Sequence, residues 1–435
     1  WLFLMVQNYQ KAFKAYDIRW KYKEEIDEML TYTMGIAIAK HLHTTPNKII
    51  LIWSDVRIPN TSLITAFIAW LQSQGIQKIY RTTINEYTNG EKYPYGICST
   101  PGLYYLAQND VDLAVAFTAS HNPPEDVGMK FFDKTCTFLS QQTLLQMFNE
   151  TYDAARILPE LPHHYDIEQF PLLETKKEQL LSFLQTKFSQ LSSSFHIGVD
   201  FSTGAAVALE KELLERLLPG QLTLINDIPD GMFSAHLSET QEHENYHQLI
   251  ETIKERKLDL WIMFDGDADR VGFVWPDGKV LGGDMILALV AEQLLLENKD
   301  LDISKKLILY EVMCSKIIPE LVTQAAGSSK MVRMGRFFIK EAMEQTGALF
   351  AGETSGHFMF SSLGNYEMPL LVLYYVLKSL TYYGSYEAMI QRVYKYPKCP
   401  VTSILVQDKQ AVLTNIKESF KNEKQVEIDG ISVYG

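Results

Sequence analysis

The feature that most limits the fold of this chain is a pattern that occurs three times, an apolar run that ends in a short polar loop. The three stretches are DLAVAFTASHNP from Asp112, DLWIMFDGDADR from Asp259 and ALFAGETSGH from Ala348. Further apolar runs at 48–55, 195–202 and 306–312 alternate with amphipathic segments of helical period. The alternation predicts an α/β protein in which three related domains present their polar loops to one cleft.

The chain is too long for one hydrophobic core. With 435 residues it should divide into roughly three or four domains of about a hundred residues each. The polar stretch LETKKEQLLSFLQTKFSQLSSS is typical of a helix that leads from a first domain into a second. We therefore expect domains at 1–150, 151–255, 256–368 and 369–435.

Charge and cysteine usage exclude several classes of partner. The net charge of -13 and the pI of about 5.3 argue against nucleic-acid and anionic-membrane surfaces, because both reward a basic face. The cysteines are scattered without metal-ligand spacing, which favours free thiols in a reducing compartment; they are Cys98, Cys136, Cys314 and Cys399. The opening WLFLMV is too short for a signal peptide, and no apolar stretch reaches bilayer length without charges. We expect a cytoplasmic protein with no nucleic-acid or membrane partner.

The stretch FDGDADR places Asp265, Asp267 and Asp269 at alternate positions. Alternate side chains of an extended segment share a face, and carboxylates held together repel unless a cation joins them. An all-oxygen ligand set suits Mg2+. A calcium EF-hand loop is excluded, because Arg270 and Pro276 stand where it needs Gly and Glu. A solvated acidic turn is the alternative. Arg270 has the opposite parity, so it should point away from the metal side, either to grip a phosphate or to form a salt bridge between domains.

FTASHNPPED, residues 117–126, begins where an apolar run ends, so Ser120 is a candidate reactive group. An ordinary turn is the alternative. His121, as the next residue of an extended loop, would point to the opposite face and be poorly placed as a base for Ser120. It could be held in the turn by hydrogen bonds or take part in proton transfer. Lys130 could donate to a phosphate or a hydroxyl group, or be solvated.

GETSGH, residues 352–357, would present Glu353, Ser355 and His357 on one face between glycines that let a ligand approach the backbone. A carboxylate beside a hydroxyl suits sugar hydroxyl groups, and a plain turn is the alternative. The chain contains no GxxxxGK[ST], GxGxxG or GxSxG motif, which disfavours nucleotide-binding and serine-hydrolase functions.

Four motifs in a fixed order carry a family resemblance: KAYDIR (14–19), TASHNPPEDVGMK (118–130), DGDADR (265–270) and GETSGH (352–357). The set resembles the α-D-phosphohexomutase family, most closely its bacterial phosphomannomutase/phosphoglucomutase branch. The resemblance implies three related α/β domains with mixed sheets around a central cleft, followed by a smaller α+β domain. It also implies that Ser120 is a phosphoserine, that Asp265, Asp267 and Asp269 bind one Mg2+ together with its phosphate, and that the GETSGH loop selects the sugar.

The implied reaction interconverts hexose 1-phosphate and hexose 6-phosphate of mannose, glucose or both. It runs through a phosphoserine enzyme and a hexose 1,6-bisphosphate, which is also the expected activator. By resemblance the catalytic residues are Ser120, His121, Lys130, Arg19 and Arg270. The substrate-binding residues are Tyr16, Glu353, Ser355, His357 and Arg336. The expected partners are hexose phosphates, and the expected state is a monomer or homodimer.

The chain departs from the family pattern at several positions. Val127, Trp20 and Arg336 stand where the family usually has Asn, Gly and a substrate-contacting His, and WSDVRIPN keeps only Asp55 and Arg57 of GxDxRxSS. The loop that holds the second phosphate in the family does not occur. We expect the fourth domain to be truncated or disordered here, and a true loss of the loop is the alternative. The alternatives are a phosphoglucosamine-type mutase, a non-catalytic sugar-phosphate-binding protein and a Mg2+-dependent phosphatase.

Overall fold

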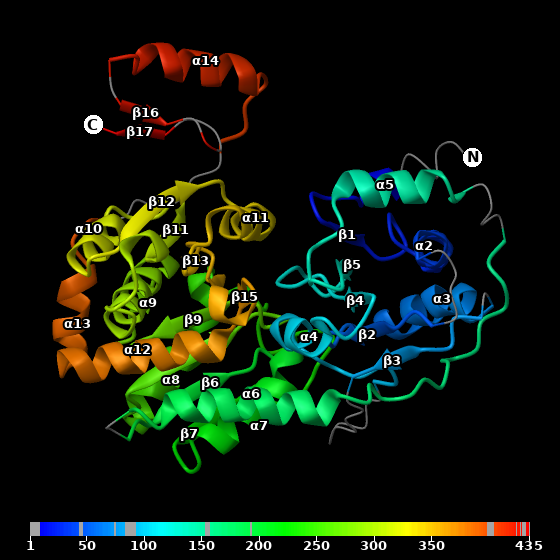
Figure 1. Ribbon diagram of the computed structural model, residues 1–435, viewed down its shortest axis with the longest axis horizontal. Helices are drawn as coiled ribbons and strands as arrows, with labels where there is room; N and C mark the ends of the chain where they lie inside the picture. Colours follow the sequence, from blue (N-terminus) through cyan, green and yellow to red (C-terminus); the bar gives the residue numbers. More distant parts are fainter. Residues whose placement is uncertain are drawn as a thin grey trace. The chain divides into compact units, whose positions relative to one another are not determined.

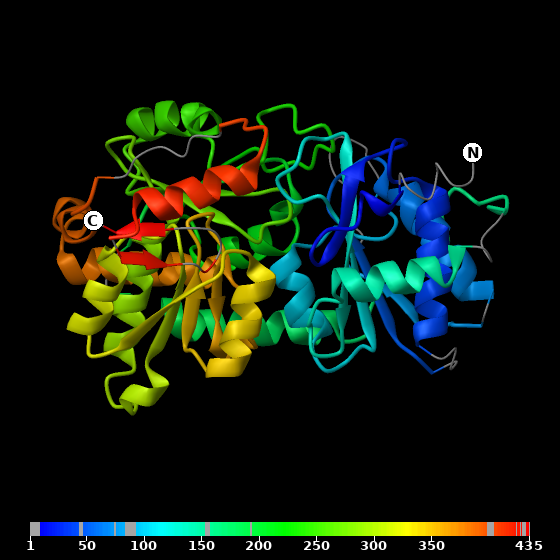
Figure 2. The same cartoon turned by 90° about the horizontal axis from the view of Figure 1, so that it is seen from above.

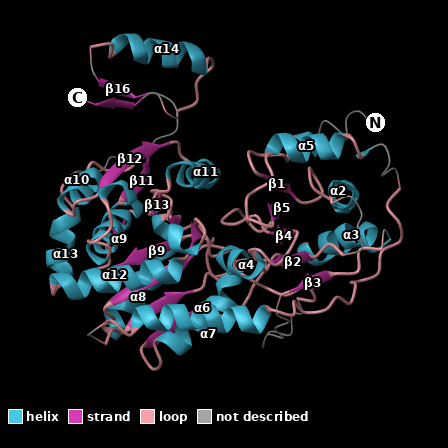
Figure 3. Ribbon diagram, in the orientation of Figure 1, coloured by secondary structure: helices cyan, strands magenta, loops and turns pink. Residues whose placement is uncertain are grey.

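The structure is a computed structural model, and it describes most of the chain. The described residues are 9–42, 47–73, 75–82, 93–152, 157–191, 194–397, 404–422, 424–426, 428 and 432–434. The chain forms two compact units, Trp1–Val280 and Leu281–Gly435 (Figure 1). The first unit contains two five-stranded sheets and the second unit contains one, each accompanied by helices (Figure 3).

The first sheet is mixed, with the strand order β1-β5-β4-β2-β3. Its strands are β1 (Asp17–Lys21), β2 (Ile50–Ser54), β3 (Ile79–Arg81), β4 (Leu113–Phe117) and β5 (Asp126–Asp133). Strands β2, β3 and β4 are parallel, whereas β5 is antiparallel to both β4 and β1. Strand β4 is buried along its whole length, as its apolar run LAVAF predicts.

Helices cover both faces of the first sheet. They are α2 (Glu28–His41), α3 (Asn60–Ser73), α4 (Thr100–Ala107) and α5 (Gln141–Asn149). Figures 1 and 2 show α4 on the face opposite to α2 and α3. The main core lies on the α2–α3 face, where Ile18, Phe117 and Met129 are buried. Side chains alternate between the two faces along a strand. Lys130, next to Met129 in β5, therefore points to the α4 face.

The second sheet has the order β10-β9-β8-β6-β7, which repeats the first sheet except that its edge strand β10 follows β9 in the chain, whereas β1 precedes the other strands of the first sheet. Its strands are β6 (Ile197–Asp200), β7 (Leu222–Ile225), β8 (Leu260–Phe264), β9 (Val271–Val274) and β10 (Val280–Leu281). Again three strands are parallel, and β9 returns antiparallel to β8. Its helices are α6 (Leu173–Phe188), α7 (Leu209–Leu217) and α8 (His247–Arg256).

The third sheet, in the second unit, has the order β12-β11-β13-β14-β15. Its strands are β11 (Leu307–Glu311), β12 (Ser328–Val332), β13 (Phe350–Gly352), β14 (Phe358–Phe360) and β15 (Tyr366–Glu367). Strand β13 is parallel to β11 and antiparallel to β14, so the third sheet has the connections of the first two. The predicted α/β class with three related domains and mixed sheets is confirmed.

Helices of the second unit pack around α9 (Gly283–Glu297), which contacts α10 (Ile317–Gln324), α12 (Pro369–Tyr383) and α13 (Tyr386–Val393). Helix α11 (Arg336–Thr346) packs on β11, β12 and β13. The last described elements are α14 (Lys409–Ser419) and the antiparallel pair β16 (Lys424–Val426) and β17 (Ser432–Tyr434).

The domain boundaries near 150, 255 and 368 stay predictions. Strands of the second sheet lie on both sides of residue 255, and the compact units divide between Val280 and Leu281. Helix α12, which begins at Pro369, packs on α9 of the same unit. Within the described part of the chain, every helix is too short or too polar to cross a bilayer.

Candidate active site

The serine loop, residues 118–126, follows β4 at the carboxyl end of the parallel strands. Ser120 has a φ of +54°, in the left-handed region that a non-glycine residue rarely adopts. Its N–H donates to the Oγ1 of Thr118 at 2.9 Å, and only 3% of the residue is exposed. The chain therefore turns sharply at Ser120 instead of continuing the extended strand.

The aspartate loop, residues 265–270, follows β8 in the same way. One oxygen from each of Asp265, Asp267 and Asp269 lies within 4.8 Å of the others, and all three residues are buried. The predicted convergence of these carboxylates is confirmed, but the expected extended backbone is not its cause. Ala268 has a φ of +56° and donates its N–H to the carbonyl oxygen of Asp265, so a turn brings the side chains together.

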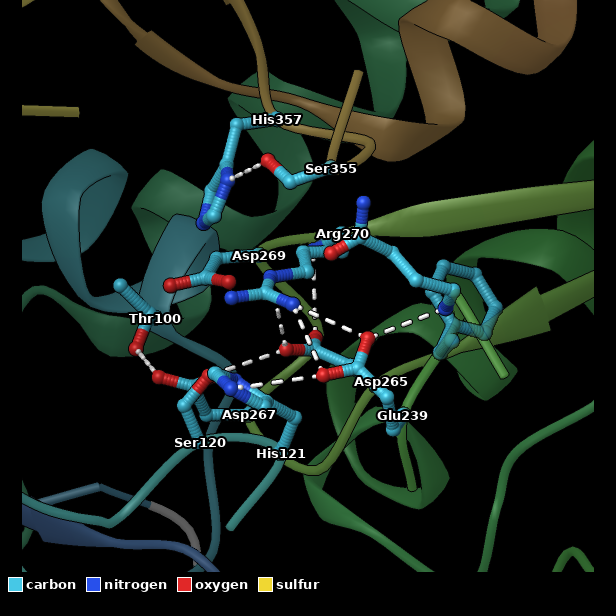
Figure 4. A network of polar contacts seen from close by, with 12 residues as sticks. Thr100, Ser120, His121, Glu239, Asp265, Asp267, Asp269, Arg270, Ser355 and His357 are labelled. Atoms are coloured by element: carbon cyan, nitrogen blue, oxygen red, sulfur yellow. Dashed lines mark hydrogen bonds and ion pairs between the residues drawn. The ribbon is translucent and has the colours of Figure 1, made fainter. Parts of the chain in front are cut away.

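The serine and aspartate loops meet within the first unit (Figure 4). The Oγ of Ser120 donates to the Oδ2 of Asp265 at 3.0 Å. The Oγ1 of Thr100, at the start of α4, donates to the Oδ2 of Asp267 at 2.6 Å. Gly266 permits this approach, because a Cβ there would lie 2.4 Å from the carbonyl oxygen of Ser120. A hydroxyl group and three carboxylates thus share one buried site.

Lys130, on β5, lies against the aspartate loop. Its Nζ is 2.5 Å from the Oδ2 of Asp267 and 3.2 Å from the Oδ2 of Asp269, and its side chain is 1% exposed. The alternative that Lys130 is solvated is therefore wrong. One buried ammonium group offsets only part of the charge of three carboxylates, which leaves the site with a demand for a further cation.

The residues present fit a divalent cation. The Oδ1 of Asp267 is buried and has no hydrogen-bond partner among the described residues, although the Oδ2 accepts from both Thr100 and Lys130. A buried carboxylate oxygen in this state is costly unless something binds it. The donors are all oxygens, as Mg2+ prefers.

His121 does not point away from Ser120, so this expectation is wrong. Its Nδ1 lies 3.3 Å from the Oγ of Ser120, and its Nε2 lies 3.3 Å from a carboxylate oxygen of Glu239 (Figure 4). The expectation assumed an extended loop, whereas the left-handed turn at Ser120 brings adjacent side chains to one side.

Arg270 was predicted to point away from the aspartate side chains, because it stands at the alternate position of the segment, but it lies close to Asp265. Its Nη1 donates to Glu239 at 3.1 and 3.3 Å, and its Nε is 3.8 Å from the Oδ2 of Asp265. Contacts therefore link Ser120, His121, Glu239, Arg270 and Asp265 in a ring. Within this ring, Arg270 and His121 are the donors near the serine hydroxyl that suit a phosphate.

Arg19 and two departures from the family pattern lie on the β1–β5 pair. Arg19 donates to Asp17 at 2.5 Å and, with its Nη1, to the side chain of Asn122 in the serine loop at 3.5 Å. Trp20 and Val127 are cross-strand partners, and Val127 belongs to the core on the α2–α3 face. Both side chains therefore lie on the α2–α3 side of the sheet, not on the α4 side, with Val127 buried in the core and Trp20 exposed.

In the second unit, the GETSGH loop brings its three predicted side chains together. Glu353 accepts hydrogen bonds from Ser355 at 2.8 Å and from the N–H of Gly335 at 2.6 Å. His357 lies 3.0 Å from the carboxylate of Glu353 and 2.8 Å from the hydroxyl of Ser355. Burial raises the pKa of Glu353, but the hydrogen bond and charge of His357, together with the hydrogen bonds from Ser355 and the N–H of Gly335, outweigh it and bring the pKa to about 2.

Arg336 and Tyr16, both predicted to bind substrate, have protein partners. Arg336 begins α11, is 2% exposed and pairs with the buried Glu367 at 2.7 Å. Tyr16 is partly buried, with its ring 4.8 Å from that of Phe138. The guanidinium group of Arg336 is therefore held by Glu367 in this structure.

Sequence reasoning missed Glu239, Thr100 and the contacts of Arg57. Glu239 lies in an irregular loop after β7, where neither its type nor its spacing marks it. Thr100 is the first residue of a short helix and looks like part of an ordinary cap. For Arg57 the sequence did offer a signal, because Asp55 and Arg57 in WSDVRIPN match the family pattern GxDxRxSS.

Comparisons with known proteins match most of the chain to one family. Residues 10–153, 178–278 and 282–391 match three family models, described as phosphoglucomutase/phosphomannomutase, alpha/beta/alpha domains I, II and III. The chain is 35% identical over 426 residues to a protein of Methanocaldococcus jannaschii named phosphomannomutase, covering 97% of this chain and 88% of that one.

Further similar proteins carry related names. A phosphomannomutase/phosphoglucomutase of Pseudomonas syringae is 28% identical over 80% of this chain and 69% of its own length. A phosphoglucosamine mutase of Gloeothece citriformis is 30% identical over 78% of this chain and 66% of its own length. The crystal structure of a phosphoglucomutase/phosphomannomutase family protein from Burkholderia thailandensis shares the fold. Its TM-score is 0.77 at 23% identity, over 98% of this chain and 88% of that one.

Proposed function

The chain belongs to the α-D-phosphohexomutase family, in its phosphoglucomutase/phosphomannomutase group, and on this premise we propose that it interconverts hexose 1-phosphates and hexose 6-phosphates. The proposed sugar is mannose, glucose or both. One observation carries the proposal: the buried Ser120 hydroxyl lies 3.0 Å from Asp265, in a cluster of three carboxylates. Enzymes of this family are isomerases that move a phosphoryl group within one substrate.

In the proposed mechanism Ser120 carries the phosphoryl group. The P–Oγ bond of phosphoserine breaks while a P–O bond forms to the free hydroxyl of a hexose monophosphate, which gives a hexose 1,6-bisphosphate. The sugar hydroxyl loses a proton and Oγ gains one. The bisphosphate then reorients and returns its other phosphoryl group to Ser120. His121 and Asp265 have atoms 3.3 and 3.0 Å from Oγ, so either can exchange the proton there.

The charged residues around Ser120 have proposed roles in this transfer. Asp265, Asp267 and Asp269 would hold Mg2+ together with the serine phosphate, and the bound ion would offset charge on the transferring group. Lys130 holds two of these carboxylates in place. Arg19 and Arg270 would donate to phosphate oxygens.

The GETSGH loop is the proposed sugar-recognition element. Glu353 and Ser355 offer a carboxylate and a hydroxyl group, and the hydrogen bonds to His357 and Gly335 fix their orientation. Tyr16 and Arg336 are proposed as additional substrate contacts. An amino-sugar phosphate is the second candidate substrate, favoured by the similarity to a phosphoglucosamine mutase. A cytoplasmic location and a monomeric or homodimeric state stay predictions.

The deciding assay incubates the protein with glucose 1-phosphate, mannose 1-phosphate or glucosamine 1-phosphate, together with Mg2+ and a trace of hexose 1,6-bisphosphate. The formation of a 6-phosphate is followed for each sugar. Ser120→Ala should abolish turnover, since no other group can carry the phosphoryl. Product from any substrate supports the mutase and ranks the sugars. Binding without product would favour a non-catalytic sugar-phosphate-binding protein, and release of inorganic phosphate faster than isomerisation would favour a phosphatase.

The metal assignment has its own test. Asp267→Asn keeps the shape of the side chain but removes one of the three carboxylate charges. We expect weaker Mg2+ binding by isothermal titration calorimetry and a turnover number at least about 100-fold lower, because charge stabilisation of the transferring group is the main catalytic contribution in phosphoryl transfer. Unchanged Mg2+ affinity in this variant would remove Asp267 from the metal site.

A further inference from the structure

Two residues behind the serine loop, Asp55 and Arg57, have no role in the mechanism above. They follow β2, the parallel neighbour of β4, where Ser54 pairs with Phe117 and the N–H of Asp55 donates to the carbonyl oxygen of Phe117 at 3.0 Å. Both side chains are fully buried and form an ion pair at 3.1 Å. Because the ion pair is neutral overall and shielded from solvent, we expect it to act on the site by holding the backbone in position and not through its charge.

Arg57 binds the backbone of the serine loop through its whole guanidinium group. Its Nη2 donates to the carbonyl oxygens of Ser120 at 2.9 Å and Asn122 at 2.6 Å. Its Nη1 donates to the carbonyl oxygens of Pro123 and Asp126, and its Nε donates to Asp55. These five hydrogen bonds equal the number of N–H donors that an arginine side chain has.

Asp55 holds the other peptide group of Ser120. Its Oδ2 accepts from the Oγ1 of Thr118 at 2.6 Å, and the same Oγ1 accepts from the N–H of Ser120 at 2.9 Å. The N–H of Ser120 is thus tied to Asp55 through Thr118, and its carbonyl is tied directly to Arg57. Between them the two tethers fix the left-handed backbone of Ser120, a conformation that persists only where surrounding contacts enforce it.

We propose that Arg57, paired with Asp55, is a positioning residue that sets the direction of the Ser120 hydroxyl for phosphoryl transfer. This inference rests on the proposed function. The left-handed turn directs Oγ to within 3.0 Å of Asp265, and the carbonyl oxygen of Ser120 lies against Gly266 on one side and Arg57 on the other. A lysine at 57 would keep the charge but has three donors and no planar fork, so it cannot bind four carbonyl oxygens and Asp55 together.

The test compares Arg57→Lys with Arg81→Lys, a matched substitution in the same sheet at a residue whose guanidinium donates to the carbonyl oxygen of Thr82. Phosphorylation of Ser120 by hexose 1,6-bisphosphate is followed by intact mass under single-turnover conditions and expressed per folded molecule. A misplacement of about 1 Å costs a reaction about 100-fold. We expect Arg57→Lys to slow phosphorylation and kcat by about 100-fold with KM within about twofold of wild type, and Arg81→Lys to change neither.

Thr118→Val is the second variant, because Arg57→Lys could reduce folding. It removes only the hydroxyl that links the N–H of Ser120 to Asp55. We expect about a tenfold slower phosphorylation per folded molecule at an unchanged KM. A purely structural role would lower the melting temperature and the folded fraction but leave the rate per folded molecule at the wild-type value, and this result would overturn the inference.

Other outcomes are also decisive. A raised KM at wild-type kcat in Arg57→Lys would mean that Arg57 serves substrate binding, which contradicts positioning. If Arg57→Lys does not fold, a wild-type rate in Thr118→Val refutes the two-tether arrangement. If the wild-type protein itself neither isomerises hexose phosphates nor accepts phosphate on Ser120, the proposed function fails first, and the inference fails with it.

Discussion

Removal of Lys130 should make the first unit depend on a divalent cation. In Lys130→Met the apolar stem is kept but the buried ammonium group, 2.5 Å from Asp267 and 3.2 Å from Asp269, is lost. Breaking a buried ion pair from one side costs about 3 to 5 kcal/mol, because the remaining charge is uncompensated. Here three buried carboxylates remain, so we expect a cost in this range when the protein is free of metal.

The assay is thermal unfolding with EDTA and with Mg2+, for wild type and Lys130→Met. A loss of 3 to 5 kcal/mol corresponds to a melting temperature lower by roughly 6 to 20 °C in a unit of this size. Mg2+ at about 100 times its dissociation constant for the variant should return about 2.7 kcal/mol to the variant. The same Mg2+ concentration should stabilise wild type less, because the ammonium group of Lys130 competes with the ion there. Lys48→Met is the control, because Lys48 pairs with Asp112 at a half-exposed site where ion pairs contribute about 0 to 1 kcal/mol.

Two results would refute this reasoning. The first is a Lys130→Met variant that melts in EDTA at the same temperature as Lys48→Met, which would mean that the carboxylates do not need a cation. The second is an equal gain from Mg2+ in wild type and variant, which would place the ion away from Lys130.

Two further predictions concern buried carboxyl groups. Burial raises the pKa of Glu353, but the contacts with His357, Ser355 and the N–H of Gly335 together outweigh it and bring the pKa to about 2. The charged form of Glu353 therefore stabilises the fold above pH ~4.5, and this stability, about 3 kcal/mol, is lost as the pH falls toward 2. Glu353→Gln should flatten the acid side of a pH series of urea unfolding, and an unchanged slope would contradict the pairing with His357. Burial raises the pKa of Glu210, which accepts a hydrogen bond from Ser99, to about 7, so wild-type stability should fall as the pH rises from about 4.5 through 7. Glu210→Gln should remove this decline between pH 5 and 8 in thermal melts, whereas a decline equal to that of wild type would show that other groups cause it.

The parts of the site that the sequence predicts are those that depend on local pattern. Apolar runs predicted the buried strands β4 and β8, and the polar residues after them do form loops at the ends of parallel strands. The convergence of Asp265, Asp267 and Asp269 was predictable because close spacing keeps side chains together in either an extended segment or a turn.

The parts that the sequence could not predict depend on left-handed backbone and on distant partners. A serine carries no signal for a φ of +54°, so the extended loop assumed for His121 was the wrong geometry. Glu239 meets His121 across 118 positions of sequence. A glutamate in a polar loop looks like a solvated charge until the fold brings a histidine and an arginine beside it.

One arrangement recurs in all three sheets and explains why the supporting residues escape notice. The three functional loops each follow the strand that precedes the antiparallel return, β4, β8 or β13. In every case a residue at the end of the neighbouring parallel strand, or just after it, contacts the functional loop or the last residue of the strand before that loop.

The supporting contacts use different chemistry each time. Arg57, after β2, binds carbonyl oxygens of the serine loop. Ser202, after β6, donates its Oγ at 2.6 Å to the carbonyl oxygen of Phe264, the last residue of β8 before the aspartate loop. Glu311, at the end of β11, accepts from the Oγ1 of Thr354 at 2.7 Å in the GETSGH loop. Parallel neighbours end at the same edge of a sheet. The topology alone therefore places the end of β2, β6 or β11 beside the functional loop that follows β4, β8 or β13. The contact can therefore be expected from the fold, while the residue type that makes it, arginine, serine or glutamate, cannot be read from the pattern of the strands.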